Sequence, residues 1–307
     1  MSMNTRQLSG AIDRRLTTIA IAYSMAELVG YKLFPRQNLG PGSHKYPVFD
    51  DDFMVADVPI RPLGVDYELS QLKFSTEDIN FTNKGLSAYY AKEAPELAKI
   101  SGVLGLQSRV VRNAMSKILL SIEVDQASLA RKTTTYNTSN RVTLTGADKF
   151  TDATSDVIGV FNDAVEAVSN VGKTPNICIM HRKTFNAIRI HPQARDYYKN
   201  SDGQLSLQQV SELVGIPIFI GDATTKKSAT SSKVSVWGND IVMAYAPQGQ
   251  SYEEPSFGYT FQNGNPKVAP FEKTGKNGFT GFVAPIDLGS KVHVTMKDAG
   301  YLIQGAI

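Results

Sequence analysis

The stretch that decides the fold is LQSRVVRNAMSKILLSIEVDQASLAR, residues 106–131. Its apolar residues recur at helical spacing on one broad face: Val111, Met115, Ile118, Ile122 and Leu129. Its charged residues fall on the other faces: Arg112, Lys117, Glu123 and Asp125. No proline interrupts the pattern, so we predict a single helix of about 39 Å that serves as a spine across a whole domain.

Before this helix, the pattern over residues 53–76 is that of strands. The tip at residues 61–64 contains proline and glycine, and apolar residues alternate with polar ones on the returning side. A two-stranded hairpin is only marginally stable by itself in water. We therefore expect this hairpin to lie on another subunit, and the alternative is that it forms the edge of its own domain's sheet.

The first fifty residues form an arm. Residues 1–30 predict one or two short helices that end at Gly30, and prolines and glycines keep the next twenty residues extended. Aromatic residues punctuate this irregular segment: Phe34, Tyr46, Phe49 and Phe53. Because such a segment cannot cover them, we expect the first eighty positions to gain lasting order only against identical copies.

After residue 140 the pattern is mixed, with short helices and strands in one compact lobe. The predicted helices contain Val157 to Val168, residues 184–190 and residues 205–214. The predicted strands cover residues 142–144, 176–180, 216–220, 234–237 and 241–245, with a mobile loop at 222–232. The last third of the chain is expected to be mostly β.

Composition excludes several classes of protein. The chain has 307 residues, of which 42% are hydrophobic and 20% charged, which is typical of a globular protein. The net charge of +3 is too balanced for a dedicated DNA reader. Cys178 is the single cysteine, so no internal disulfide forms, and its apolar neighbours predict a core residue.

The sequence shows no catalytic signature. It contains neither G-x-S-x-G nor H-E-x-x-H, and Gly172-Lys173-Thr174 lacks the earlier glycine and the helix that a phosphate loop requires. His181 and His191 favour surface or capping roles, and the four histidines give no zinc spacing. We therefore predict no catalytic, cofactor-binding or metal residues, and a protein that is not an enzyme.

The order of elements points to a family. The arm helix ends near Ala22-Tyr23, and Phe34-Pro35, Lys45-Tyr46, Phe49-Asp50 and Phe53 follow before the hairpin, the spine helix and the lobe. Over nearly the whole chain this order resembles the major capsid proteins of tailed bacteriophages, which have the Hong Kong 97-type fold. The resemblance implies an α+β protein with an N-terminal arm (1–49), an extended loop (50–81), a peripheral domain (82–155 and 251–307, with the spine helix at 106–131) and an axial domain (156–250).

The resemblance also implies a function. Copies of such a subunit gather into pentamers and hexamers of an icosahedral head, the virion capsid, around double-stranded DNA bound without sequence specificity. The residues expected at contacts between subunits are Phe34, Tyr46, Phe49, Phe53, Arg61, Asp66, Tyr67 and Lys73. Other expected partners are a portal and a decoration protein. A separate scaffolding protein is also expected, because little chain precedes the hairpin. Synthesis and assembly are expected in the host cytoplasm, with no membrane partner.

Two further expectations concern basic residues. Some relatives cross-link a loop lysine to a neighbouring subunit, which makes Lys73 the candidate here, although a solvated lysine is the ordinary state of such a residue. Five basic residues among the first 36 positions predict a weak inward contact with DNA or scaffold: Arg6, Arg14, Arg15, Lys32 and Arg36.

Two other interpretations stay open at this point. One is an encapsulin, a nanocompartment shell of the same fold with an enzyme cargo, although the extended residues 31–56 favour the phage form. The other is an α/β enzyme whose active site is assembled from residues that are far apart in the sequence. Gel filtration and negative-stain microscopy distinguish them, because an enzyme gives small oligomers with turnover.

Overall fold

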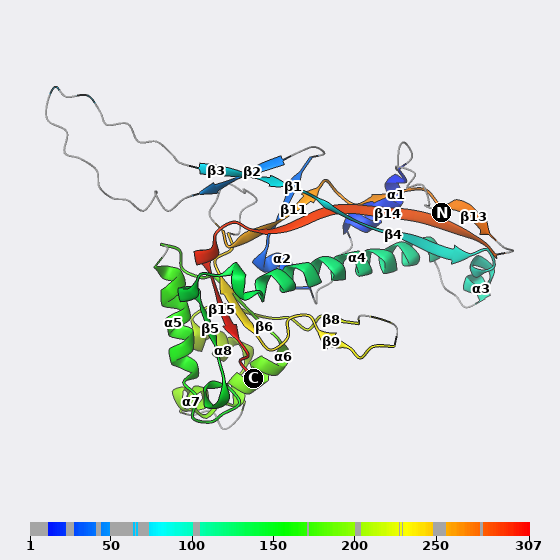
Figure 1. Cartoon of the computed structure of the whole chain (residues 1–307). Coiled ribbons are helices and arrows are strands. Elements are labelled where there is room, and N and C mark those ends of the chain that lie inside the picture. Colours follow the sequence, from blue (N-terminus) through cyan, green and yellow to red (C-terminus); the bar gives the residue numbers. More distant parts are fainter. Residues whose placement is uncertain are drawn as a thin grey trace.

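The computed structural model describes residues 12–22, 28–40, 44–49, 64, 66, 74–100, 105–170, 172–199, 204–226, 228, 230–247, 256–276 and 279–307. These residues form an elongated part, built on a long sheet and one long helix, and a compact lobe at one end of it (Figure 1). A two-stranded hairpin projects from the elongated part, on the opposite side from the helix (Figure 1).

The long helix α4 spans Leu106–Ala130, so the predicted spine is confirmed. It begins after Gly105, whose φ of 69° lies in the left-handed region that glycine adopts without steric cost. Its apolar stripe, which includes Val111, Met115 and Ile118, is buried. The helix covers one face of the long sheet along most of its length (Figure 1).

The long sheet has the strand order β1-β11-β14-β12, with β13 and β4 also paired to β14. The strands are β1 (Arg36–Leu39), β4 (Thr82–Ala91), β11 (Gly258–Asn263), β12 (Lys267–Val268), β13 (Glu272–Lys276) and β14 (Phe279–Val294). Alternate residues of β14 point to one face. Of these, Ala284, Ile286 and Leu288 are buried in one cluster with the apolar stripe of α4. The strand-rich last third is therefore confirmed.

The lobe is a five-stranded sheet of order β5-β15-β10-β6-β7 with four helices around it. Its strands are β5 (Arg141–Thr143), β6 (Ile177–Met180), β7 (Ile218–Ile220), β10 (Ile241–Ala244) and β15 (Gly300–Gln304). Its helices are α5 (Val157–Ser169), α6 (Arg182–Ile190), α7 (Pro192–Tyr197) and α8 (Leu207–Val214). Each predicted helix and strand of the lobe is present, with ends displaced by a few residues.

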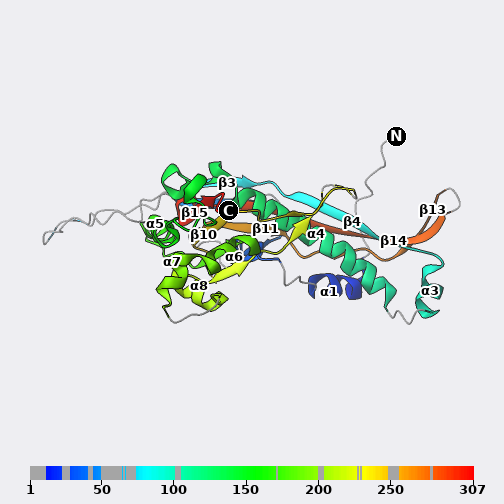
Figure 2. The same ribbon diagram turned by 90° about the horizontal axis from the view of Figure 1, so that it is seen from below.

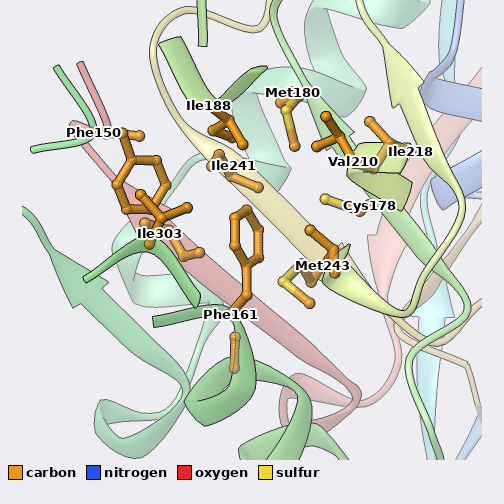
Figure 3. Close-up of a cluster of buried hydrophobic side chains, with 14 of the residues drawn as sticks. Phe150, Phe161, Cys178, Met180, Ile188, Val210, Ile218, Ile241, Met243 and Ile303 are labelled. Carbon is orange, nitrogen blue, oxygen red and sulfur yellow. The ribbon is translucent and has the colours of Figure 1, made fainter. Parts of the chain in front are cut away.

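The core of the lobe lies between this sheet and its helices (Figure 3). Phe161 of α5 and Ile241 and Met243 of β10 point into it, and each is almost fully buried. Cys178 belongs to the same cluster and is 0% exposed, so burial raises the pKa of its thiol well above the ordinary value. The prediction that Cys178 is a core residue is confirmed.

Two strands lie in a different domain from the one predicted. β5 and β15 fall in the ranges assigned to the peripheral domain, yet both pair within the lobe's sheet, where β15 lies between β5 and β10. The reason is that the apolar run of β15 is buried on both faces, which requires a central position in a sheet. The final strand of the chain therefore completes the lobe.

The N-terminal segment packs against its own chain, which corrects the expectation that the arm needs a partner surface. Helix α1 (Arg14–Ala22) buries Leu16 and Ala20 against α4. Helix α2 (Gly30–Leu33) contacts α4, and β1 pairs in parallel with β11. Gly30 begins a helix rather than ending one, so that prediction was wrong. Residues 28–39 are thus ordered by contacts within the subunit.

The remaining elements are short. They are α3 (Ala94–Ile100), β8 (Thr224–Thr225), β9 (Val234–Ser235) and turns of 3-10 helix at Thr133–Thr135, Thr138–Asn140, Gly146–Asp148 and Lys297–Ala299. Strands β8 and β9 pair at the base of the predicted loop, which lies below α4 (Figure 1). Within the described ranges, no helix combines the length and the apolar character that a membrane crossing demands.

Candidate functional site

The hairpin is formed by β2 (His44–Phe49) and β3 (Phe74–Ile79), which pair in antiparallel fashion from His44 opposite Ile79 to Phe49 opposite Phe74. In the part of the chain that the structure describes, these two strands pair only with each other. The hairpin is therefore not an edge of the long sheet. Strand β2 precedes the predicted range of 53–76 and β3 overlaps its last three residues, while most of that range lies outside the described residues.

The base of the hairpin is anchored to the subunit. Ile79 is 6% exposed and clusters with Tyr259 and Phe261 on the face of β11 that points away from α4. Further out, Lys45 and Asp78 form an ion pair of 3.9 Å in which both side chains are more than 60% exposed. Such an exposed pair adds little stability. The anchor fixes where the hairpin leaves the subunit.

Of the residues predicted to contact other subunits, Phe34 does not fit. It is 0% exposed, and its ring lies 5.5 Å from that of Phe257, between centroids. Because β1 pairs with β11, Phe34 lies beneath the chain's own sheet, where it joins the cluster around Ala127 and Trp237. The prediction for Phe34 was therefore wrong, because its burial is complete within one subunit.

The other predicted contact residues lie in or near the hairpin. Tyr46 and Phe49 belong to β2, with side chains outside the description, and Asp66 is exposed. The rest lie outside the described residues: Phe53, Arg61, Tyr67 and Lys73. For all seven, contact with a neighbouring subunit stays a prediction.

Arm, spine helix and lobe meet at Glu123 of α4. Its Oε1 accepts a hydrogen bond from the Val29 backbone N–H (3.1 Å), and its Oε2 accepts one from the N–H of Gly30 (2.8 Å). Oε1 also accepts one from the indole Nε1–H of Trp237 (2.7 Å). One carboxylate thus holds the start of α2 and the segment before β10 on the same turn of the spine helix.

The Glu123 side chain is 0% exposed. Burial raises its pKa above the ordinary value of 4.5, because a charged group is poorly solvated there, while the three N–H donors act in the opposite direction. Gly30 makes this close approach possible. A Cβ atom on Gly30 would lie 2.2 Å from Gln126 Oε1 and 2.6 Å from Glu123 Oε2. The junction therefore requires glycine at the start of α2.

Two further contacts extend the junction. Gln126 Nε2 donates to Thr260 Oγ1 (2.8 Å), whose hydroxyl in turn donates to the Phe34 carbonyl (3.1 Å). At the end of α4, Arg131 Nε donates to Asp240 Oδ2 (2.6 Å), and Asp240 Oδ1 accepts from the Gly305 N–H (2.9 Å). The C-terminal half of the spine is thus tied to the arm, the long sheet and the lobe.

The sequence analysis missed this junction, since it placed Glu123 on the polar side of the helix. A signal was present, because Leu119, Glu123 and Gln126 continue the helical spacing of the buried stripe. A glutamate in such a stripe indicates a buried acceptor with nearby N–H donors. What the sequence does not contain is the identity of those donors, which lie 93 or more positions away.

The two basic residues of the arm nearest the junction are positioned by aromatic rings. Lys32 Nζ lies 4.1 Å from the centroid of the Phe219 ring, and the guanidinium of Arg36 lies 3.7 Å from that of Tyr31. Together they line a groove of about 580 Å³ between the arm and the lobe. The predicted role of these cations in contacting DNA or scaffold stays a prediction.

The histidines have structural roles. His181 caps α6, where its Nδ1 accepts from the Lys183 N–H (3.2 Å). His191 Nε2 lies 2.8 Å from the carbonyl of Asp152 and 3.1 Å from Ser155 Oγ. A carbonyl only accepts, so this nitrogen carries the proton and is not a base for Ser155. Among the described residues, no group of three or more His, Cys, Asp or Glu side chains is placed to hold a metal ion.

Comparison with known proteins shows which family the chain resembles. The family model for phage major capsid protein E matches residues 120–254. The major capsid protein of Burkholderia phage BcepMu is 28% identical, over 96% of each chain. A phage-related protein from Bordetella bronchiseptica RB50 has a similar solved structure, with a TM-score of 0.80, 24% identity and coverage of 96% of this chain and 98% of that one. The capsid of cyanophage P-SCSP1u has a TM-score of 0.56, 14% identity and coverage of 99% and 92%.

These matches run through the spine helix, the lobe and the long sheet, and they agree with the observed α+β architecture. They also agree with a chain whose buried polar groups hold its own parts together and whose described hairpin strands pair only with each other. The sequence relatives are structural proteins of virions rather than enzymes or encapsulins. The chain is therefore similar to phage major capsid proteins over almost its whole length, and its fold is that of the Hong Kong 97-type capsid proteins.

Proposed function

We propose that this capsid subunit assembles into the pentamers and hexamers of an icosahedral head, and that hairpin β2–β3 docks on a neighbouring copy. The observation that carries the proposal is the hairpin itself. Its strands pair only with each other among the described residues, and burial on the subunit is seen at its base, at Ile79. A ribbon of this kind gains stability when a second surface covers it.

Symmetry makes such a contact sufficient for a shell. Each copy offers one hairpin and receives one, so the contact repeats around a ring in head-to-tail fashion and closes. Many moderate contacts then act together, and association stabilises the segments as well as the particle. The contact residues proposed on this basis are Tyr46, Phe49, Phe53, Arg61, Asp66, Tyr67 and Lys73.

We propose four functional parts with amended boundaries. The arm and the extended loop keep their predicted positions, and β5 and β15 pass from the peripheral domain to the axial domain, which otherwise comprises residues 156–250. Strands β5 and β15 belong to the same sheet as β10, and strands of one sheet move together, which supports this division.

Other partners follow from the resemblance to this family. We propose that the shell encloses double-stranded DNA without sequence specificity, that a separate scaffolding protein and a portal take part in assembly in the host cytoplasm, and that a decoration protein binds outside. A cross-link at Lys73 stays a prediction, because its acceptor is not identified.

The test is a deletion of residues 59–67, at the tip of the hairpin. We expect the purified subunit to keep its helical circular dichroism and to form no closed particles in negative-stain microscopy. Replacement of the same residues by a Gly/Ser linker of equal length separates side-chain contacts from reach. Normal particles from both variants would contradict the proposal, and loss of helicity would place the hairpin within the subunit's own fold.

A further inference from the structure

Helix α4 and the pair β8–β9 lie on the side of the subunit that faces away from the long sheet. Figure 1 shows α4 beneath the sheet and the pair β8–β9 below α4. Helix α1 lies beside α4 at the level of the sheet, where its Thr17 hydroxyl accepts a hydrogen bond from the N–H of Val268 in β12 (3.3 Å) (Figures 1 and 2). We call the exposed side chains of α4, of β8–β9 and of the residues next to these strands the helix face.

The charges of the helix face have one sign. Its exposed cations are Arg109, Arg112 and Lys117 of α4, with Lys226 and Lys233 next to β8 and β9. Helix α4 also carries two acidic residues, but Glu123 is buried and Asp125 forms an ion pair with Lys84 of β4. Residues 223–235 contain three lysines and no acidic residue, although Lys227 lies outside the described residues. The exposed carboxylate of Asp125 is thus neutralised by its ion pair with Lys84.

The opposite side of the long sheet is balanced. Strand alternation places there the residues that do not face α4, since Ala284, Ile286 and Leu288 do face it. By register, Lys267 lies opposite Asp287, Glu272 opposite Val283 and Lys291 opposite Phe261. Among the side chains that the structure describes in these strands, two cations and two anions therefore share that side. Although the chain has a net charge of only +3, its positive charge is concentrated on one side.

A subunit that forms the wall of a shell presents one side to the interior. This step rests on the proposed function. We infer that the helix face is the interior side, and that it binds the phosphate backbone of the enclosed duplex DNA through Arg109, Arg112 and Lys117. Lysine and arginine contacts to phosphates position a duplex without reading its bases. The arrangement fits a wall that must accept DNA of any sequence.

Backbone binding has a measurable signature. Each phosphate neutralised by a cation releases condensed counterions, so the logarithm of the binding constant falls with the logarithm of salt concentration by about 0.9 per contact. Removing two contacts reduces that slope by about 2 and weakens binding on the order of 50-fold at about 0.1 M salt. Removing the same number of charges from a side of the subunit that does not contact DNA leaves the slope unchanged.

The experiment measures binding of the full-length subunit to a fluorescent random-sequence duplex over a series of salt concentrations. The variant is Arg112→Gln/Lys117→Gln, and the matched control is Lys267→Gln/Lys291→Gln, which removes the same charge from the opposite side. We expect the slope to fall for the first pair and to stay at the wild-type value for the control. Equal slopes for both pairs would overturn the inference. So would a helix face that binds a polyglutamate peptide but no duplex, which would indicate an acidic scaffolding protein.

Microscopy of the same preparations separates this inference from the proposed function. If closed particles form but the salt slopes of the two variant pairs are equal, the helix face is not the DNA-binding side and the proposed shell is supported. A reduced slope for the first pair without closed particles supports duplex binding by the helix face and rejects the shell.

Discussion

The carboxylate of Glu123 accepts a hydrogen bond of 2.7 Å from the indole N–H of Trp237, which lies 114 positions further along the chain. The same carboxylate holds the backbone of Val29 and Gly30. The spine helix is therefore a hub as well as a strut, and the arm and the lobe keep their positions through one buried acceptor.

Glu123→Ala removes that acceptor. It leaves two backbone N–H groups and the indole N–H without a partner, and each unsatisfied buried donor costs about 1–3 kcal/mol. We expect the free energy of unfolding of unassembled subunits to fall by about 3 kcal/mol or more. Asp125→Ala, two residues along the same helix, is the control. The Asp125 side chain is 52% exposed and Lys84 keeps its hydrogen bonds to Ser121, so we expect a loss below about 1 kcal/mol. Equal losses in urea denaturation would contradict the hub.

The raised pKa of Glu123 predicts a pH dependence. Between the ordinary pKa of 4.5 and the raised pKa, the folded state binds more protons than the unfolded state. Stability therefore falls as pH rises through this interval. Glu123→Gln does not titrate and should lose less stability over the same interval. Emission of Trp237, the single tryptophan, reports the transition, and identical pH slopes for both proteins would reject this contribution.

Gly30→Ala tests the close approach at the start of α2. In most helices this change is favourable by up to about 1 kcal/mol. Here the added Cβ meets Gln126 and Glu123 at less than 3 Å, so we expect a loss of about 1–3 kcal/mol. Gly40→Ala is the control, because nothing lies within 4 Å of its added Cβ. Thermal denaturation of the two variants gives the sign, and a more stable Gly30→Ala protein would refute the packing described.

Arg131→Ala tests the tie between the spine and the lobe. Asp240 is 6% exposed, and loss of Arg131 leaves its carboxylate with the Gly305 N–H but without a cation. We expect a loss of about 2 kcal/mol, since a buried charge loses its partner. Arg182→Ala breaks the more exposed pair with Asp222 and should cost less than about 1 kcal/mol. A larger loss of stability for Arg182→Ala than for Arg131→Ala would contradict the link between the spine helix and the lobe.

Local pattern was sufficient for much of the fold. The spine helix and the helices and strands of the lobe follow from apolar spacing and turn residues, because each is defined within ten to thirty positions. Pairing between distant segments was not accessible in this way. The place of β15 in the lobe, the parallel pairing of β1 with β11 and the burial of Phe34 all depend on contacts across more than 50 positions.

For the same reason, the arm was assigned to a neighbouring copy too readily. Aromatic residues on an irregular segment indicate burial but not the surface that buries them. Phe34 is covered by its own chain, whereas the hairpin from residue 44 onward has a covered base and no further layer among the described residues. We therefore predict that the boundary between self-contained and shared structure lies near Leu39.

A density map of assembled particles tests the central claim most directly, at a resolution that traces β2 and β3. The account predicts that the hairpin beyond Ile79 contacts an adjacent subunit in every pentamer and hexamer. A hairpin folded back on its own subunit, with closed shells held by other surfaces, would contradict it.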